Sequence, residues 1–134
     1  MLKGNLDIAT EKIIYSLVIP CYNESDNLEE LVGYCRRLLS ERQDVEIILV
    51  DNGSTDCTHE ILTNLLINSP ASRIRSIRVE DNKGYGYGIL VGLQECVGDM
   101  LGWTHADLQT DPEDVYKGFQ LMLSTETFVK GSRA

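Results

Sequence analysis

The sequence predicts an α/β protein, in which an open, mostly parallel sheet carries helices on both of its faces. Two observations lead to this prediction. Short apolar runs rich in β-branched residues alternate along the chain with longer segments whose apolar residues recur at helical spacing. This alternation of strand and helix repeats from one end of the chain to the other, as is typical of parallel sheets with crossover helices. With 134 residues, the chain is long enough for one domain with a substantial core.

Five segments are expected to be strands. Residues 13–19 and 45–50 are almost wholly apolar, which is typical of strands buried on both faces. Residues 74–79 largely alternate between apolar and polar side chains, and this indicates a strand nearer an edge of the sheet. An apolar run ending at Thr104 and a last short run, 127–129, complete the set.

Four helices are expected between and after these strands. Pro20 should end the first strand, and Asp26 with Glu29 fits a capping box at the start of a helix that ends near Arg42. Pro70 should close the second helix. The apolar residues at helical spacing on the four helices are Leu28, Leu31, Val32, Cys35, Leu38 and Leu39; Cys57, Ile61, Leu62, Leu65 and Leu66; Ile89, Leu90, Leu93 and Val97; and Val115, Phe119, Met122 and Leu123.

Composition excludes several classes of protein. A formal net charge of −9 argues against non-specific binding to nucleic acid and against docking on anionic lipid by charge alone. The 4 cysteines form no Cys-x-x-Cys pair, so we expect no zinc site, no disulfide framework and a reducing compartment. We see no secretory signal and no apolar run near the roughly 20 residues that span a bilayer. The abrupt end at residues 129–134 indicates a cut within a longer protein, so the predicted division is a loose arm, 1–12, and a domain, 13–134, truncated at its C-terminus.

Three polar loops are expected to meet at one edge of the sheet. Ligands of open parallel sheets bind outside the carboxyl ends of the strands. That rule brings together residues 20–25, 51–56 and 104–111, each of which carries carboxylates. Such a crevice would repel a bare diphosphate, but it suits a diphosphate bridged by a divalent cation.

The third loop is the candidate metal site. If it stays extended, His105, Asp107 and Gln109 point to one side and could hold a divalent cation. Oxygen ligands suit Mg²⁺ or Mn²⁺, and the imidazole favours Mn²⁺. Taken alone, the loop is explained better by a neutral histidine, a turn aspartate and a surface amide. Asp111 and Pro112 then form a strong helix start.

The other loop residues leave alternatives open. Asp51 could accept hydrogen bonds from a base or ribose, or form a local turn, and we favour the first. Asp56 is better explained as a helix cap. Glu24 could cap or face a ligand, and Tyr22 could pack in the core or stack on a base.

The glycine-rich loop at residues 81–88 does not match the dinucleotide-binding fingerprint, because its spacing is Gly-x-Gly-x-Gly and it follows the third strand. Binding of NAD is therefore poorly supported, and the chain has no Walker loop. A nucleotidyltransferase fits less well too, since the loop after the first strand, 21–24, is neither glycine-rich nor basic.

Five motifs together resemble the family 2 glycosyltransferases, which have the Rossmann-like GT-A fold. The group resembled most is that of the dolichol- or polyprenyl-phosphate mannosyltransferases. The motifs follow in the family's order and spacing at residues 17–24, 48–56, 82–84, 106–109 and 131–133.

The resemblance implies an inverting transfer of a sugar from a nucleotide-diphospho-sugar to a lipid-phosphate or saccharide acceptor, with Mg²⁺ or Mn²⁺ as cofactor. It implies a role in making cell-envelope polysaccharide or glycolipid. The implied location is the cytoplasm, at the inner face of a membrane, and contact with that membrane would be made only through the acceptor or through a missing C-terminal region. Asp107, Gln109 and His105 are the implied metal ligands. The residues implied to bind the nucleotide sugar are Pro20, Tyr22, Glu24, Asp51, Lys83, Gly84, Ala106, Asp107 and Arg133.

Two residues depart from the family's pattern. His105 stands where the first aspartate of the Asp-x-Asp motif is usual, and Asn52 replaces the second of a usual pair of aspartates. The acceptor side and the catalytic base of the family lie beyond the matched region, so no catalytic residue is assigned. The alternative hypothesis is a catalytically degenerate module that binds a nucleotide sugar or a partner protein.

Overall fold

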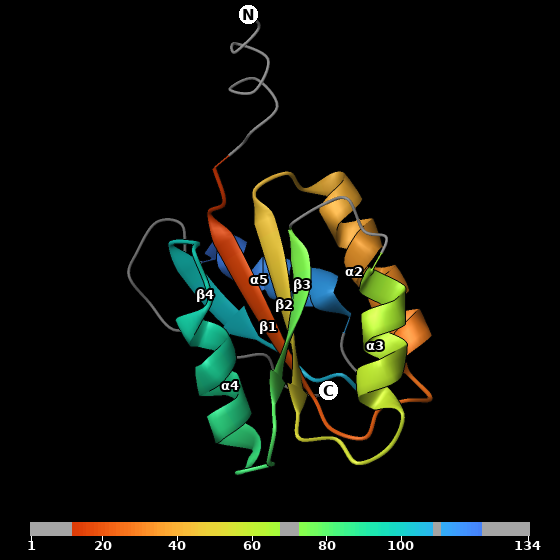
Figure 1. Cartoon of the computed structure of the whole chain (residues 1–134). Coiled ribbons are helices and arrows are strands. Elements are labelled where there is room, and N and C mark those ends of the chain that lie inside the picture. The colour runs from red at the N-terminus through yellow and green to blue at the C-terminus, as the bar shows by residue number, and fades with distance from the viewer. Residues whose placement is uncertain (1–11, 68–72, 109–110, 122–134) are drawn as a thin grey trace, which may run out of the picture.

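The protein forms a parallel four-stranded sheet in the order β3-β2-β1-β4, with helices on both faces (Figure 1). The structure, a computed structural model, describes residues 12–67, 73–108 and 111–121. Its elements are β1 (Tyr15–Cys21), α2 (Leu28–Glu41), β2 (Val45–Asn52), α3 (Thr58–Leu66), β3 (Ile74–Val79), α4 (Tyr85–Gln94), β4 (Met100–Trp103) and α5 (Pro112–Leu121). The predicted fold class is confirmed.

The two faces of the sheet bury separate apolar clusters, because successive side chains of a strand point to opposite faces. Leu17 and Ile19 of β1 pack on the side of α2, α3 and α5, whereas Val18 packs on the side of α4. Figure 1 places α5 behind the sheet, where Phe119 stacks on Tyr15 with ring centroids 5.0 Å apart. No helix in the described part of the chain is long and apolar enough to span a bilayer.

Pro20 does not end the first strand, contrary to the prediction, since β1 continues to Cys21. Proline lacks an N–H group, so it can lie in a sheet only where no ladder bond is needed. Val18 accepts a hydrogen bond from Thr104 N, on the side of β4. The backbone polar groups of a strand point to alternate sides, so the nitrogen of Pro20 also points towards β4. The last residue pair between β1 and β4 is Val18 with Trp103, so no ladder bond is needed at Pro20.

The predicted capping box is also wrong. The first residue of α2 is Leu28, and its N-cap is Asn27, whose side chain makes no capping bond. Asn27 Nδ2 instead donates to Glu24 Oε1 at 3.0 Å, within the turn before the helix. At the other end, α2 has its C-cap at Arg42, as predicted.

Leu90 and Val97 were expected to face inward, but they are 60% and 65% exposed. Gly88, Ile89 and Gly92 are the buried residues of α4. A Cβ atom at Gly92 would overlap Val18 and lie 2.9 Å from Val50 Cγ2, so the helix approaches the sheet more closely than leucines would allow. The predictions for Pro70, Met122, Leu123 and the strand at 127–129 concern residues outside the described ranges.

Glu46 is an acidic residue near the start of β2, and it is 2% exposed. Its carboxylate accepts hydrogen bonds from Ser16 Oγ (2.7 Å), Val97 N (2.8 Å) and Arg75 Nη1 (2.8 Å). Burial alone would raise the pKa of Glu46, but the bonds from Ser16, Val97 and Arg75 together hold the pKa below its usual range. These contacts tie β1, β3 and the segment after α4 to β2.

Replacing Gly92 by alanine should lower the free energy of unfolding by about 1–3 kcal/mol, because the added methyl group overpacks the contact with Val18 and Val50. The matched control is Gly33→Ala in α2, where an added Cβ meets nothing within 4 Å. That change should raise stability by about 0.5–1 kcal/mol through helix propensity. Urea unfolding of both variants tests the prediction, and equal effects of the same sign would contradict it.

The stability that Glu46 contributes should depend on pH. Because its folded pKa is lowered, the contribution is fully present above the unfolded pKa of about 4.3 and is lost as the pH falls through the folded value. Glu46→Gln should lower the free energy of unfolding by about 1–3 kcal/mol at neutral pH. The difference between the native protein and the variant should shrink below about pH 4.3. A difference that stays constant down to the acid transition would contradict this account.

Candidate functional site

A hollow of about 110 Å³ opens at the carboxyl ends of β1, β2 and β4. Six of the residues that were predicted to bind a ligand or a metal line it, together with three that were not. The lining residues are Pro20, Cys21, Tyr22, Glu24, Asn52, Tyr85, His105, Ala106 and Asp107. Ligand pockets usually measure about 300–1,000 Å³, so the hollow formed by the described residues suits one portion of a larger ligand.

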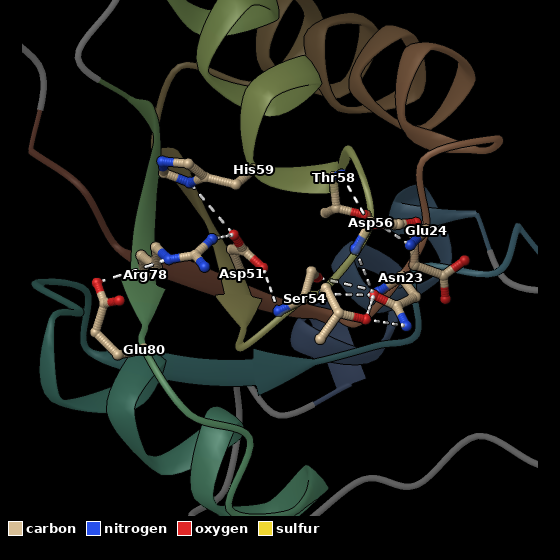
Figure 2. Close-up of polar contacts among 10 residues, drawn as sticks. Asn23, Glu24, Asp51, Ser54, Asp56, Thr58, His59, Arg78 and Glu80 are labelled. Carbon is tan, nitrogen blue, oxygen red and sulfur yellow. Dashed lines mark hydrogen bonds and ion pairs between the residues drawn. The ribbon is translucent and has the colours of Figure 1, made fainter.

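Asn23 fixes the loop that follows β1. Its φ of 51° is left-handed, a conformation that asparagine tolerates better than most residues do. Its side-chain Oδ1 accepts hydrogen bonds from Thr55 N (2.8 Å) and Asp56 N (3.3 Å), and its own N–H donates to Ser54 Oγ (3.0 Å) (Figure 2). We call these contacts between residue 23 and residues 54–56 the Asn23 clasp. The clasp joins the loops that follow the two central strands.

Further bonds between the same loops set the start of α3. Glu24 N donates to Thr58 Oγ1 (2.9 Å), and Asp56 Oδ1 accepts from Thr58 N (2.8 Å). Asp56 Oδ2 also lies 3.4 Å from its donor Ser25 N. Burial opposes ionisation of Asp56, but the bonds from Thr58 and Ser25 lower its pKa overall. The N-cap residue of α3 is Cys57, one position after the predicted cap, but the Asp56 side chain does accept a bond from the first N–H of the helix.

Asp51 lies near the end of β2 and is 1% exposed. Its Oδ1 accepts from Ser54 N (3.1 Å), and its Oδ2 accepts from Arg78 Nη1 (2.6 Å) (Figure 2). His59 Nδ1 lies 3.3 Å from that second oxygen. Both oxygens of Asp51 thus have partners within the protein, and Asp51 is not among the described residues that line the hollow. A role of Asp51 towards a base or ribose stays a prediction.

Asn52 lines the hollow and holds the glycine-rich loop. Its Nδ2 donates to Gly84 O at 3.1 Å, while its Oδ1 is buried and has no hydrogen-bond partner among the described residues. Gly84 has a φ of 106°, which only glycine adopts without strain, and Gly88 leaves no room for a Cβ beside the Asn52 amide. An aspartate here, as is usual in the motif, would offer no N–H to the Gly84 carbonyl.

Besides Asp51, two predicted binding residues in the described ranges, Lys83 and Gly84, are not among the residues that line the hollow. Gly84 is the N-cap of α4, and Lys83 Nζ lies 5.2 Å from the centroid of the Tyr87 ring. Gln109 and Arg133 lie outside the described residues.

The loop after β4 is bent, so the condition set for its three side chains, an extended loop, is not met in its described part. The chain turns at residues 106–108, and Leu108 has a left-handed φ of 67°. His105 and Asp107 nevertheless line the same hollow. Before α5, which begins at Pro112, Glu113 N donates to Asp111 Oδ1 (2.9 Å), and this agrees with the prediction of Asp111 as its cap.

Tyr85, which sequence reasoning missed, contacts His105. The Tyr85 hydroxyl lies 3.1 Å from His105 Nδ1, and the two rings stack with centroids 5.5 Å apart and planes 16° from parallel. Burial, followed by the charge of Asp107, raises the pKa of Tyr85. A signal was available, since the glycine-rich loop follows β3 and must open at the same edge of the sheet as the other loops.

The described part of the chain holds no group of three or more His, Cys, Asp or Glu side chains placed to bind a metal ion. An imidazole and a carboxylate, from His105 and Asp107, do line one hollow. A divalent cation is often held by one or two carboxylates together with substrate phosphates. The donors present therefore fit a cation that is completed by a phosphate ligand better than a metal bound by protein alone.

The chain is similar to known glycosyltransferases in sequence. Residues 16–134 match the model of the family described as Glycosyl transferase family 2. The undecaprenyl-phosphate 4-deoxy-4-formamido-L-arabinose transferase of Pseudomonas fluorescens (strain Pf0-1) is 38% identical over 108 residues, covering 75% of this chain and 29% of that protein. The enzyme of the same description from Yersinia pestis (strain Pestoides F) is 39% identical over 104 residues, covering 75% and 31%. The chain thus spans about a third of the length of these curated relatives.

Two solved structures are similar to the chain in fold. The mannosyltransferase PcManGT from Pyrobaculum calidifontis, in complex with GDP-Man and Mn²⁺, superposes with a TM-score of 0.72 at 20% identity, covering 85% of this chain and 33% of that one. S. aureus TarS 1–349 in complex with UDP superposes with a TM-score of 0.65 at 21% identity, covering 82% and 32%. Both likenesses agree with the predicted α/β fold class.

Removing the side chain of Asn23 should loosen both loops. Asn23→Gly keeps the left-handed backbone but loses the side-chain bonds, and we expect it to lower the free energy of unfolding by about 1–2 kcal/mol. Asn23→Ala should cost about 1 kcal/mol more, because alanine resists a positive φ. In both variants, the amides of Thr55 and Asp56 should exchange hydrogen faster than in the native protein. The control is Asn64→Ala on the exposed side of α3, and unchanged exchange in Asn23→Gly would contradict the role of the clasp.

Proposed function

Because the chain belongs to glycosyl transferase family 2, we propose that it is the donor-binding part of an enzyme that moves a sugar from a nucleotide-diphospho-sugar to an acceptor. The proposed domain comprises residues 13–134, preceded by a loose arm, 1–12. The observation that carries the proposal is the hollow at the carboxyl ends of β1, β2 and β4, where Tyr22, Glu24 and Asp107 meet.

The acidic character of this hollow calls for a cation when a diphosphate binds. A divalent cation would neutralise the negative charge that develops on the departing nucleoside diphosphate. Asp107 and Gln109 are the proposed ligands, with His105 as a third candidate. The Mn²⁺ and GDP-Man in the related PcManGT structure support a divalent cation, and either Mg²⁺ or Mn²⁺ suits oxygen ligands.

The other site residues have proposed roles towards the donor. Tyr22 is 47% exposed beside the hollow, so its ring is free to stack on a base. Lys83, Gly84 and Arg133 are assigned to the donor by the motifs they occupy. Asp51 can act on a base or ribose only if its present partners, Arg78 and His59, share its carboxylate with the ligand.

The proposed acceptor is a lipid phosphate, and the names of the undecaprenyl-phosphate transferases support this choice over a saccharide. An oxygen of the acceptor phosphate attacks the anomeric carbon of the sugar from the face opposite the leaving group. The bond to the donor phosphate breaks, its electron pair leaves with the nucleoside diphosphate, and the configuration inverts. Because a lipid phosphate is already ionised at neutral pH, this attack needs no general base. Such an acceptor would bring the protein to a membrane surface, and we propose the cytoplasmic face.

A second candidate is a degenerate module that holds a nucleotide sugar or a partner protein without catalysis. It is favoured by one observation, the histidine at position 105 where the family's motif has an acidic residue.

Calorimetric titration of UDP and GDP into the chain, with Mn²⁺, Mg²⁺ or a chelator, tests the proposal. One nucleotide should bind more tightly with a divalent cation, and Asp107→Ala should weaken that binding at least about tenfold by removing a charge-assisted contact. The control is Asp99→Ala. Asp99 is an exposed acidic residue that pairs with Lys12, and it lies just before β4, at the end of the strands opposite to the hollow.

The possible results separate the two candidates. Binding of neither nucleotide under any condition would contradict a donor site in this chain. Nucleotide binding without sugar transfer or donor hydrolysis by a longer protein would favour the degenerate module. Full binding by Asp107→Ala would contradict the assigned metal ligand.

A further inference from the structure

Tyr85 and His105 form a pair that no motif predicts. Tyr85 is the first residue of α4, and His105 follows β4, so the two rings meet only because both elements end at the hollow. Stacking of the rings limits rotation of the imidazole, and the contact of 3.1 Å joins its Nδ1 to the tyrosine hydroxyl. The orientation of His105 is thus set by a neighbour from another element.

The identity of this neighbour decides which ring nitrogen carries the proton. A neutral imidazole has one N–H donor and one bare nitrogen that accepts. The partner of Nδ1 is a phenol hydroxyl, which has a proton to donate and an oxygen that accepts less well than an imidazole nitrogen does. The favoured arrangement is therefore O–H of Tyr85 donating to Nδ1, which leaves the ring proton on Nε2.

A histidine that binds a metal has the opposite arrangement. Such a residue usually donates its second ring N–H to a carboxylate, a backbone carbonyl or water, and this leaves a bare nitrogen for the metal. In His105 the second nitrogen meets a hydroxyl instead. We propose that Tyr85 is a positioning residue that keeps His105 in the Nε2–H form, so that His105 donates a hydrogen bond to the bound nucleotide in place of binding the metal.

The inference rests on the proposed function and makes it more specific. An Nε2–H group is complementary to an oxygen acceptor, and the phosphate oxygens of a nucleoside diphosphate are the strongest acceptors the donor brings. Where a carboxylate would repel those oxygens, His105 attracts them. The metal then depends on Asp107 and its neighbours in the motif and does not depend on His105.

The tautomer can be measured without any ligand. In the chain labelled with ¹⁵N in its histidines, at about pH 8.5, where an ordinary imidazole is neutral, His105 should carry its proton on Nε2. Tyr85→Phe should move the ¹⁵N shift of Nδ1 towards that of a nitrogen with no hydrogen bond, and Tyr87→Phe should leave it unchanged. A proton on Nδ1 in the native chain would overturn the inference.

Binding of UDP or GDP in chelator provides the second test. His105→Ala should weaken binding of the nucleoside diphosphate about tenfold, with little effect on binding of the nucleoside alone. His105→Gln, which keeps an N–H donor at a similar reach, should recover part of the loss. Affinity for Mn²⁺ in the presence of nucleotide should fall in Asp107→Ala and stay within about twofold of the native value in His105→Ala. Loss of Mn²⁺ affinity in His105→Ala, with no loss of binding in chelator, would overturn the inference.

The two tests separate this inference from the function on which it rests. If no nucleotide binds to the native chain, the proposed donor site fails, and the tautomer measurement still decides the role of Tyr85. If nucleotide binds but His105 carries its proton on Nδ1, the donor site stands and the inference fails.

Discussion

The site depends on the parallel register of the two central strands. β1 and β2 pair residue by residue from Tyr15 with Val45 to Cys21 with Asp51, so the loops that follow them leave the sheet at the same level. The Asn23 clasp then joins those loops by side-chain to backbone bonds. Backbone polar groups that would otherwise need water find partners in the facing loop, and this holds the wall of the hollow in place before any ligand arrives.

Charge is distributed unevenly around this frame. The buried Asp51 is neutralised by Arg78, so it supports the loop without adding negative charge to the hollow. Glu24 and Asp107 line the hollow itself. The protein thus separates a buried carboxylate that is paired with Arg78 from the carboxylates that line the hollow, although all of them lie near the ends of neighbouring strands.

Much of this arrangement could be predicted from the sequence, because apolar runs and loop composition are local signals. The alternation of apolar runs with helical segments predicted the parallel sheet. The rule that ligands bind at the carboxyl ends of the strands predicted that Tyr22, Glu24 and Asp107 lie close together. Two of the errors concern contacts between distant parts of the chain. Pro20 stays within β1 because β4 is the shorter strand, and Tyr85 meets His105 because of where α4 begins. Neither the length of β4 beside β1 nor the contact of Tyr85 with His105 can be predicted from a local sequence pattern.

The contacts of α4 have a consequence for how the family's sequences can diverge. Bonds at its two ends hold the helix, from Asn52 to Gly84 O at one end and from Arg75 to Glu95 O at the other, while Gly92 fits against the sheet between them. The outward residues of α4, such as Leu90, take no part in setting its position. Mutations there can accumulate, and new surface properties can evolve, without moving the helix end from which Tyr85 reaches the site.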